Sequence, residues 1–77
     1  MEINIISFGK IAEFIHPQQL VVNNTPDTDT LKLELEKTYP ALAAIKYVIA
    51  LNKQIVQTNT LLQDHSTLAI MPPFSGG

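Results

Sequence analysis

The chain of 77 residues contains no cysteine and no arginine, and each absence excludes a class of function. Without cysteine there is no disulfide, no thiolate metal site and no persulfide carried on a side chain. Arginine is the side chain best suited to phosphates and base edges, and seven carboxylates against five lysines give a net charge of -2. We therefore expect no nucleic-acid partner. Charged residues make up only 16% of the chain, which predicts an apolar part of the surface that meets other proteins.

Long apolar segments are also missing. No run approaches the ~20 residues that a membrane helix needs, and the opening MEINIISF lacks the positive charge of a secretory signal. We expect a cytoplasmic protein with no membrane partner. A chain of this size buries only about 60% of the surface of its unfolded form, so residues 1–77 should make a single domain with little interior for a catalytic cleft.

Runs of β-branched and other apolar residues predict the strands. The first two, Glu2–Phe8 and Gln19–Asn24, should pair as a hairpin. A second hairpin is predicted over Tyr47–Val56, where Asn52-Lys53 forms the tight turn and Lys53 is expected to be a solvated turn residue. The last strand is Thr67–Met71.

Between the hairpins, the composition favours a helix over Thr28–Thr38 that stops before Pro40. Thr28 is the predicted N-cap, and Lys32 with Glu36 is expected to form an ion pair on the wet side. The buried stripe is predicted from helical spacing to be Leu31, Leu35, Thr38 and Leu42. Together the elements predict an α+β fold, with a mixed sheet of about five strands and one main helix across one face.

The final segment, residues 72–77, has a composition that suits a functional tail. Pro72 and Pro73 lack N–H donors, so the sheet should end before them and the chain should leave as a stiff arm. Gly76 and Gly77 carry no side chain, so they can enter a channel that any side chain would block. The reactive group at the tip is the α-carboxylate of Gly77, which becomes an electrophile only after a partner activates it. A frayed end is the alternative interpretation.

The ending LAIMPPFSGG, together with VIALNKQIV, ISFGKIAEF and the Leu-rich helix after Thr28, resembles the MoaD-type sulfur carriers. This family comprises the small subunits of molybdopterin synthase, within the ubiquitin-like β-grasp class. The resemblance covers the whole chain. It implies that an E1-like adenylating enzyme uses ATP to activate Gly77, which is then loaded with sulfur as a thiocarboxylate.

The resemblance further implies that the tail enters the large subunit of molybdopterin synthase, in a heterotetramer, and gives its sulfur to a cyclic pyranopterin precursor. The chain would be a non-catalytic sulfur-donor subunit that binds no cofactor itself. If the first and last strands are neighbours, Ile6, Phe8, Ala69 and Met71 point away from the helix and form an apolar patch beside the tail. The expected partner-binding residues are Phe8, Met71, Pro72, Pro73, Phe74 and Ser75.

Two positions depart from the family pattern, and several alternatives stay open. Ala12 stands where the family often has arginine, and the turn at Asp64-His65-Ser66 lacks the glycine that the family has there. His16 and His65 are far apart in sequence with no cysteine near them, so we expect no metal site. The alternatives are a sulfur carrier for thiamine or cysteine synthesis, a ubiquitin-like protein modifier, and a plain interaction domain.

Overall fold

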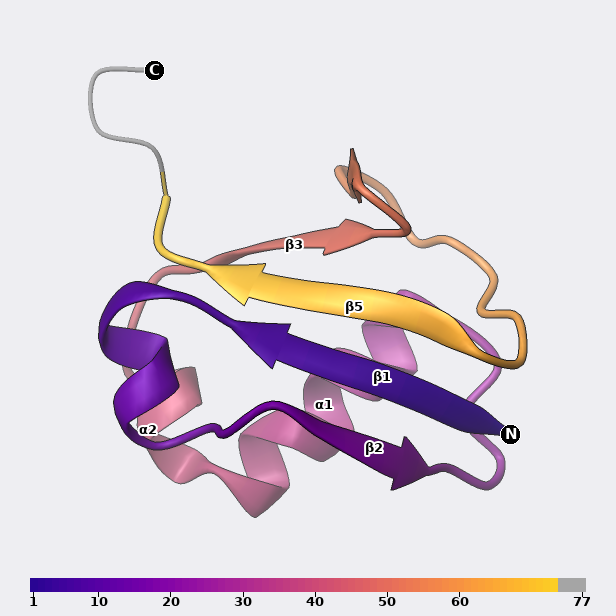
Figure 1. The fold of residues 1–77 in the computed structure, drawn as a ribbon, viewed down its shortest axis with the longest axis horizontal. Helices are drawn as coiled ribbons and strands as arrows, with labels where there is room; N and C mark the ends of the chain where they lie inside the picture. The colour runs from indigo at the N-terminus through magenta and orange to yellow at the C-terminus, as the bar shows by residue number, and fades with distance from the viewer. Residues whose placement is uncertain (74–77) are drawn as a thin grey trace.

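A five-stranded mixed sheet dominates the computed structural model, which describes residues 1–73 (Figure 1). Its strands are β1 (Glu2–Ser7), β2 (Gln18–Val21), β3 (Val48–Leu51), β4 (Gln54–Ile55) and β5 (Ser66–Met71). They lie in the order β2-β1-β5-β3-β4; β1 and β5 are parallel, and the other neighbours are antiparallel. The last strand in sequence is therefore the central strand of the sheet.

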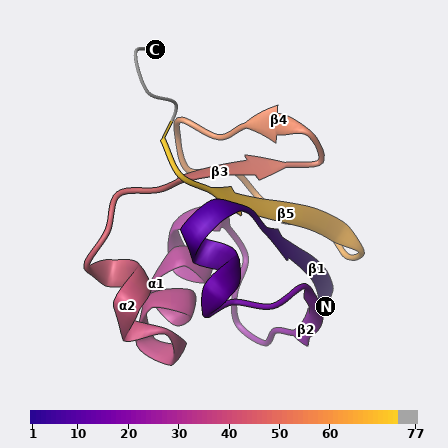
Figure 2. The same ribbon diagram turned by 60° about the vertical axis from the view of Figure 1, so that its left-hand side comes forward.

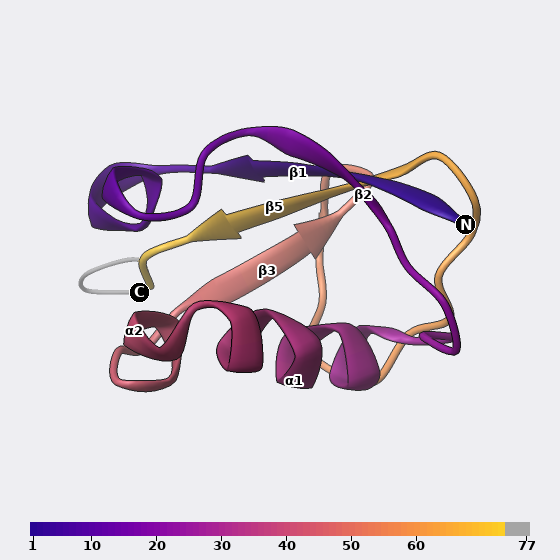
Figure 3. The same ribbon diagram turned by 90° about the horizontal axis from the view of Figure 1, so that it is seen from below.

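One face of the sheet is covered by α1 (Thr28–Thr38), which is followed at once by the short helix α2 (Pro40–Ala43) (Figure 3). A 3-10 helix, η1 (Gly9–Glu13), connects β1 to β2. The buried core lies between the sheet and these helices and consists of Ile3, Ile5, Ile11, Ile15, Leu31, Leu35, Leu42, Ile49, Leu62, Leu68 and Ile70. The α+β, ubiquitin-like β-grasp fold predicted from the sequence is confirmed.

The helix α1 has the predicted bounds, but the predicted N-cap is wrong. Asp27 is the N-cap: its Oδ1 accepts a hydrogen bond of 2.9 Å from the backbone N–H of Thr30. The hydrogen bonds from Thr30 lower the pKa of the Asp27 carboxyl. Thr28 is buried, and its hydroxyl accepts from the backbone N–H of Thr60 at 3.0 Å. Asp27 and Thr28 both suit an N-cap by residue type. The hydrogen bond from the distant Thr60 engages the Thr28 hydroxyl, and Asp27 takes the N-cap position.

Two further expectations on α1 are corrected. Thr38 is exposed, and its hydroxyl donates to the backbone oxygen of Glu34 at 3.0 Å, so it does not belong to the buried stripe. An ion pair between Lys32 and Glu36 was predicted, but both side chains contact Tyr47 instead. The Lys32 Nζ lies 5.6 Å from the centre of the Tyr47 ring, and the Tyr47 hydroxyl donates to the Glu36 carboxylate. Partial burial, with Glu36 adding to it, raises the pKa of the Tyr47 hydroxyl.

The helices η1 and α2 were not predicted, and β2 is shorter than predicted. It ends at Val21, before Asn24 adopts a positive φ of 56° in the following turn. Within residues 1–73, no helix combines the length and the apolar character that crossing a membrane requires.

Candidate functional site

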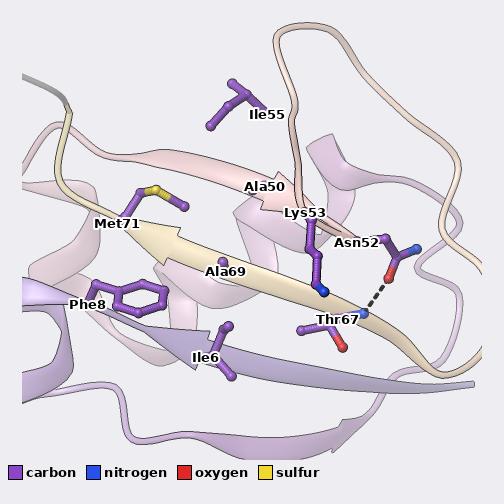
Figure 4. Close-up of a pocket in the computed structure, with 9 residues that line it drawn as sticks. All are labelled: Ile6, Phe8, Ala50, Asn52, Lys53, Ile55, Thr67, Ala69 and Met71. Atoms are coloured by element: carbon purple, nitrogen blue, oxygen red, sulfur yellow. Dashed lines mark hydrogen bonds between the residues drawn. The ribbon is translucent and has the colours of Figure 1, made fainter.

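The face of the sheet opposite α1 is largely apolar and open (Figures 3 and 4). Strand register places Ile6, Ala69 and Ala50 side by side across β1, β5 and β3. A hollow of about 530 Å³ lies on this face and is lined by Ile6, Phe8, Ala50, Asn52, Lys53, Ile55, Thr67, Ala69 and Met71. The hollow faces solvent, because α1 and the core lie on the other side of the sheet.

Ile6, Phe8, Ala69 and Met71 lie together on this face as predicted, but Ala69 is only 9% exposed and counts as buried. The alternate apolar side chains of the same two strands are at most 1% exposed; these are Ile3, Ile5, Leu68 and Ile70. The two strands are neighbours as predicted, and the backbone N–H of Phe8 continues their pairing by donating to the Ile70 oxygen at 3.0 Å. Phe8 therefore lies next to Met71, and it is 50% exposed (Figure 4). The structure brings these side chains together; their role in binding stays a prediction.

Lys53 is the charged side chain at the rim of this hollow. The turn between β3 and β4 has positive φ at Asn52 (49°) and Lys53 (72°), as a tight hairpin turn of this kind requires. Asn52 ties the turn to β5: its backbone N–H donates to the Thr67 oxygen, and its Oδ1 accepts from the Thr67 N–H, each at 2.9 Å (Figure 4). Lys53 is exposed, as expected for a turn residue, and it also lines the hollow.

The root of the predicted tail leaves the sheet beside Phe8. Strand β5 ends at Met71, and Pro72 and Pro73 follow as exposed residues. Pro72 packs against Gly9, which has a φ of +60° and so little space that a Cβ would lie 2.9 Å from the Pro72 Cγ. Gly9 is not among the site residues predicted from the sequence. A glycine directly after a strand is a signal for a turn, but it does not reveal a partner 63 residues further along the chain.

The remaining predicted tail residues, Phe74, Ser75, Gly76 and Gly77, lie outside the described residues. The predicted segment 72–77 is therefore represented here by Pro72 and Pro73. The site that the structure describes consists of the open apolar face and the tail root beside it.

At the opposite end of the sheet, His65 lies between two carboxylates. Its Nδ1 is 3.4 Å from the Glu2 Oε2, and its Nε2 is 3.5 Å from the Asp64 Oδ2. The backbone N–H of Glu2 donates to Asp64, which lowers the pKa of the Asp64 carboxyl. His65 takes a positive φ of 64°, so the turn forms without glycine. His16 is not part of this group, and within residues 1–73 no group of three His, Asp or Glu side chains is arranged to hold a metal ion.

Sequence comparison finds proteins that are similar to this chain over nearly its whole length. A family model described as the ThiS family matches residues 5–77. The molybdopterin synthase sulfur carrier subunit of Arabidopsis thaliana is 30% identical over the whole chain, which covers 84% of that protein.

Two solved structures share the fold over the full length of both chains. One, in a complex of subunits 1 and 2 of the molybdopterin-converting factor from Helicobacter pylori, has a TM-score of 0.74 and 25% identity. The other, SAMP1 from Haloferax volcanii, has a TM-score of 0.77 and 18% identity, which shows likeness of fold alone. With the family model matching nearly all of its length, the chain belongs to the ThiS family.

Proposed function

We propose that this chain is the sulfur carrier subunit of a molybdopterin synthase. The observation that carries the proposal is the position of the tail root: β5 runs through the middle of the sheet and delivers Pro72 beside the open apolar face. Such a face next to a terminus with one activatable carboxylate suits a protein that docks and then hands its terminus to an enzyme. The likeness to a curated sulfur carrier subunit supports the same function.

The chemistry resides in the α-carboxylate of Gly77. In the first step, a carboxylate oxygen attacks the α-phosphorus of ATP on an E1-like adenylating enzyme, and pyrophosphate leaves. Sulfide, as HS⁻, then attacks the carbonyl carbon of the acyl adenylate, AMP leaves with the bonding electron pair, and the S–H proton is lost to solvent. The product is a thiocarboxylate, whose sulfur is passed to a cyclic pyranopterin precursor while water supplies the oxygen that restores the Gly77 carboxylate. This chain supplies the carboxylate and the docking surface, and its partners supply the catalytic groups.

The docking surface of the proposal is the open face around Phe8 and Met71, continued by Pro72 and Pro73. Its partner is the large subunit of molybdopterin synthase, as two copies of each chain in a heterotetramer in the cytoplasm. Support comes from the H. pylori structure, which is a complex of two subunits. Because the adenylating enzyme must also reach Gly77, we propose that it binds the same face at a different time.

The direct test is the intact mass of the protein purified from cells that contain its partners. The proposal expects a form that is heavier by the replacement of one oxygen atom with sulfur. A variant with one residue appended after Gly77 should fold but never gain this mass, whereas the same residue placed before Met1 should change nothing. If the blocked, uncleaved variant still acquires the sulfur, Gly77 is not the site and the proposal fails.

The same measurement separates the alternatives. A protein modifier uses the same activated carboxylate, but an amine attacks it, so the chain would be found in a ladder of amide-linked conjugates. A carrier for thiamine or cysteine synthesis would gain sulfur but would not support molybdopterin formation with the large subunit. Either result would replace the proposed function by another within the same fold.

A further inference from the structure

The contact between Gly9 and Pro72 joins the turn after β1 to the first residue beyond β5. Figure 1 shows that β1 and β5 end at the same side of the sheet, and Figure 2 shows η1 beside the end of β5. A Cβ on Gly9 would lie 2.9 Å from the Pro72 Cγ and 3.3 Å from its Cδ. Carbon atoms pack at about 3.5–4.0 Å, so no residue other than glycine fits against Pro72 in this arrangement.

We infer that Gly9 is a positioning residue for the tail: its bare Cα lets the Pro72 ring close against the turn and fixes where the tail leaves the sheet. The inference rests on the proposed function for its consequence in activation and transfer. The placement itself rests on the distances and the backbone of the described residues.

A collision at this point must move Pro72, because the other side of the contact is held. The Phe8 N–H is bonded to the Ile70 oxygen at 3.0 Å, and Gly9 opens η1, whose Ile11 is 1% exposed. Pro72 follows the last residue of β5 and is exposed. Its Cγ and Cδ belong to a ring closed on the backbone nitrogen, so the ring cannot rotate away as an open side chain does, and only its pucker can change without moving the main chain.

Gly9 combines two constraints that substitutions can separate. Its φ of +60° is unfavourable for alanine but tolerated by asparagine, which this chain already places at positive φ at positions 24 and 52. Both alanine and asparagine carry a Cβ that would meet Pro72. Gly9→Ala therefore introduces strain and collision, whereas Gly9→Asn introduces mainly the collision.

The functional consequence follows from the geometry of activation. The adenylating enzyme must place the Gly77 carboxylate in line with the α-phosphorus of ATP while it holds the carrier by its folded surface. A displacement of about 1 Å in such a site can reduce the rate about a hundredfold. A shift of Pro72 moves the point from which the tail starts. The tail or the enzyme would then have to distort to bring the Gly77 carboxylate back into line with ATP.

The experiment compares the wild type with Gly9→Ala, Gly9→Asn, Pro72→Ala and the double variant Gly9→Asn/Pro72→Ala. The assay is ATP–pyrophosphate exchange catalysed by the adenylating enzyme, with kcat/KM for the carrier as the readout. Ile3→Val is the matched control, because Ile3 is fully buried near the start of β1 and its truncation lowers stability without touching the tail. Denaturation midpoints are measured for every variant.

We expect Gly9→Ala and Gly9→Asn each to lower kcat/KM by about ten- to a hundredfold, with the smaller loss of stability for asparagine. Pro72→Ala removes the ring atoms that a Cβ at position 9 would meet. The double variant should therefore react as fast as Pro72→Ala alone, which a merely destabilising role of Gly9 does not predict. Ile3→Val should react as fast as the wild type.

The inference is overturned if Gly9→Asn reacts like Ile3→Val, or if the defects of Gly9→Asn and Pro72→Ala simply multiply in the double variant. A second measurement does not depend on the proposed function. In the free wild-type protein, NMR should show cross-peaks between the Gly9 Hα and the Pro72 Hγ and Hδ protons, and Gly9→Asn should weaken them. Their absence from the wild type overturns the placement, whereas a wild type that shows them but is never adenylated overturns only the proposed function.

Discussion

Truncating Phe8 tests whether the open face is a docking surface or part of the folding core. Phe8 is 50% exposed, and full burial of such a side chain is worth about 1.5–3 kcal/mol, so Phe8→Ala should cost about 1 kcal/mol of stability. Leu68 is fully buried, and Leu68→Ala should cost about 2–5 kcal/mol because a cavity is left behind. In a domain of this length, 1 kcal/mol lowers the melting temperature by about 4–8 °C.

In binding to the partner, the variant on the open face should lose more affinity than a variant in the core. An aromatic side chain at the centre of an interface commonly contributes about 2 kcal/mol or more, which is about thirtyfold in Kd. Phe8→Ala should therefore weaken binding to the large synthase subunit about thirtyfold, and Met71→Ala should weaken it in the same direction. Ile3→Val, with an expected stability loss of about 0.5–1.5 kcal/mol in the core, should leave the Kd unchanged.

The assay pairs thermal unfolding of each variant with calorimetric titration of the large subunit at a temperature where all variants are folded. Two results would refute the reasoning. If Phe8→Ala unfolds as easily as Leu68→Ala, Phe8 belongs to the core. If Phe8→Ala binds as tightly as Ile3→Val, the apolar face is not the docking surface, and the partner must bind the tail alone.

Three other predictions concern single side chains. Lys53→Gly should raise stability by about 1 kcal/mol in urea unfolding, because φ is 72° there, while Lys53→Gln should not. The fold lowers the pKa of Asp27, so its contribution to stability is complete above its usual pKa of about 3.9 and is lost as pH falls through the lower folded-state value. Asp27→Asn, which keeps a cap, should make urea midpoints at pH 7 and pH 3 more alike. Tyr47→Phe should lower the free energy of unfolding by about 1 kcal/mol, because the hydrogen bond to Glu36 is lost. In an absorbance titration it should also remove the tyrosine whose pKa is raised above the ordinary value.

Features set by local chemistry could be predicted from the sequence. The bounds of α1 follow from its Leu, Lys and Glu content and from Pro40, and the hairpin turn follows from Asn52. Alternation along β1 and β5 was enough to sort the side chains that face α1 from those on the open face, because successive side chains of a strand point to opposite faces. The parallel pairing of these two strands was available only through the family resemblance.

Features set by distant contacts could not be predicted in this way. Asp27 and Thr28 are equally good caps by type, and the bond from the Thr60 N–H to the Thr28 hydroxyl is invisible in a local window. The contacts of Lys32 and Glu36 with Tyr47 could not be predicted for the same reason, since Tyr47 lies outside α1. Gly9 carried a signal for a turn, but its fit to Pro72 depends on how two distant segments meet.

The central position of β5 has a consequence for how the protein is made. During synthesis on the ribosome, β1 with β2 and β3 with β4 emerge as separate two-stranded pieces, and such hairpins are marginally stable in water. Both pieces need Ser66–Met71 between them before the sheet is continuous and α1 has a complete surface to cover. Folding should therefore begin late, after almost the entire domain has left the exit tunnel. A nascent chain stalled before β5 would expose its apolar residues to chaperones and proteases instead of presenting a folded carrier.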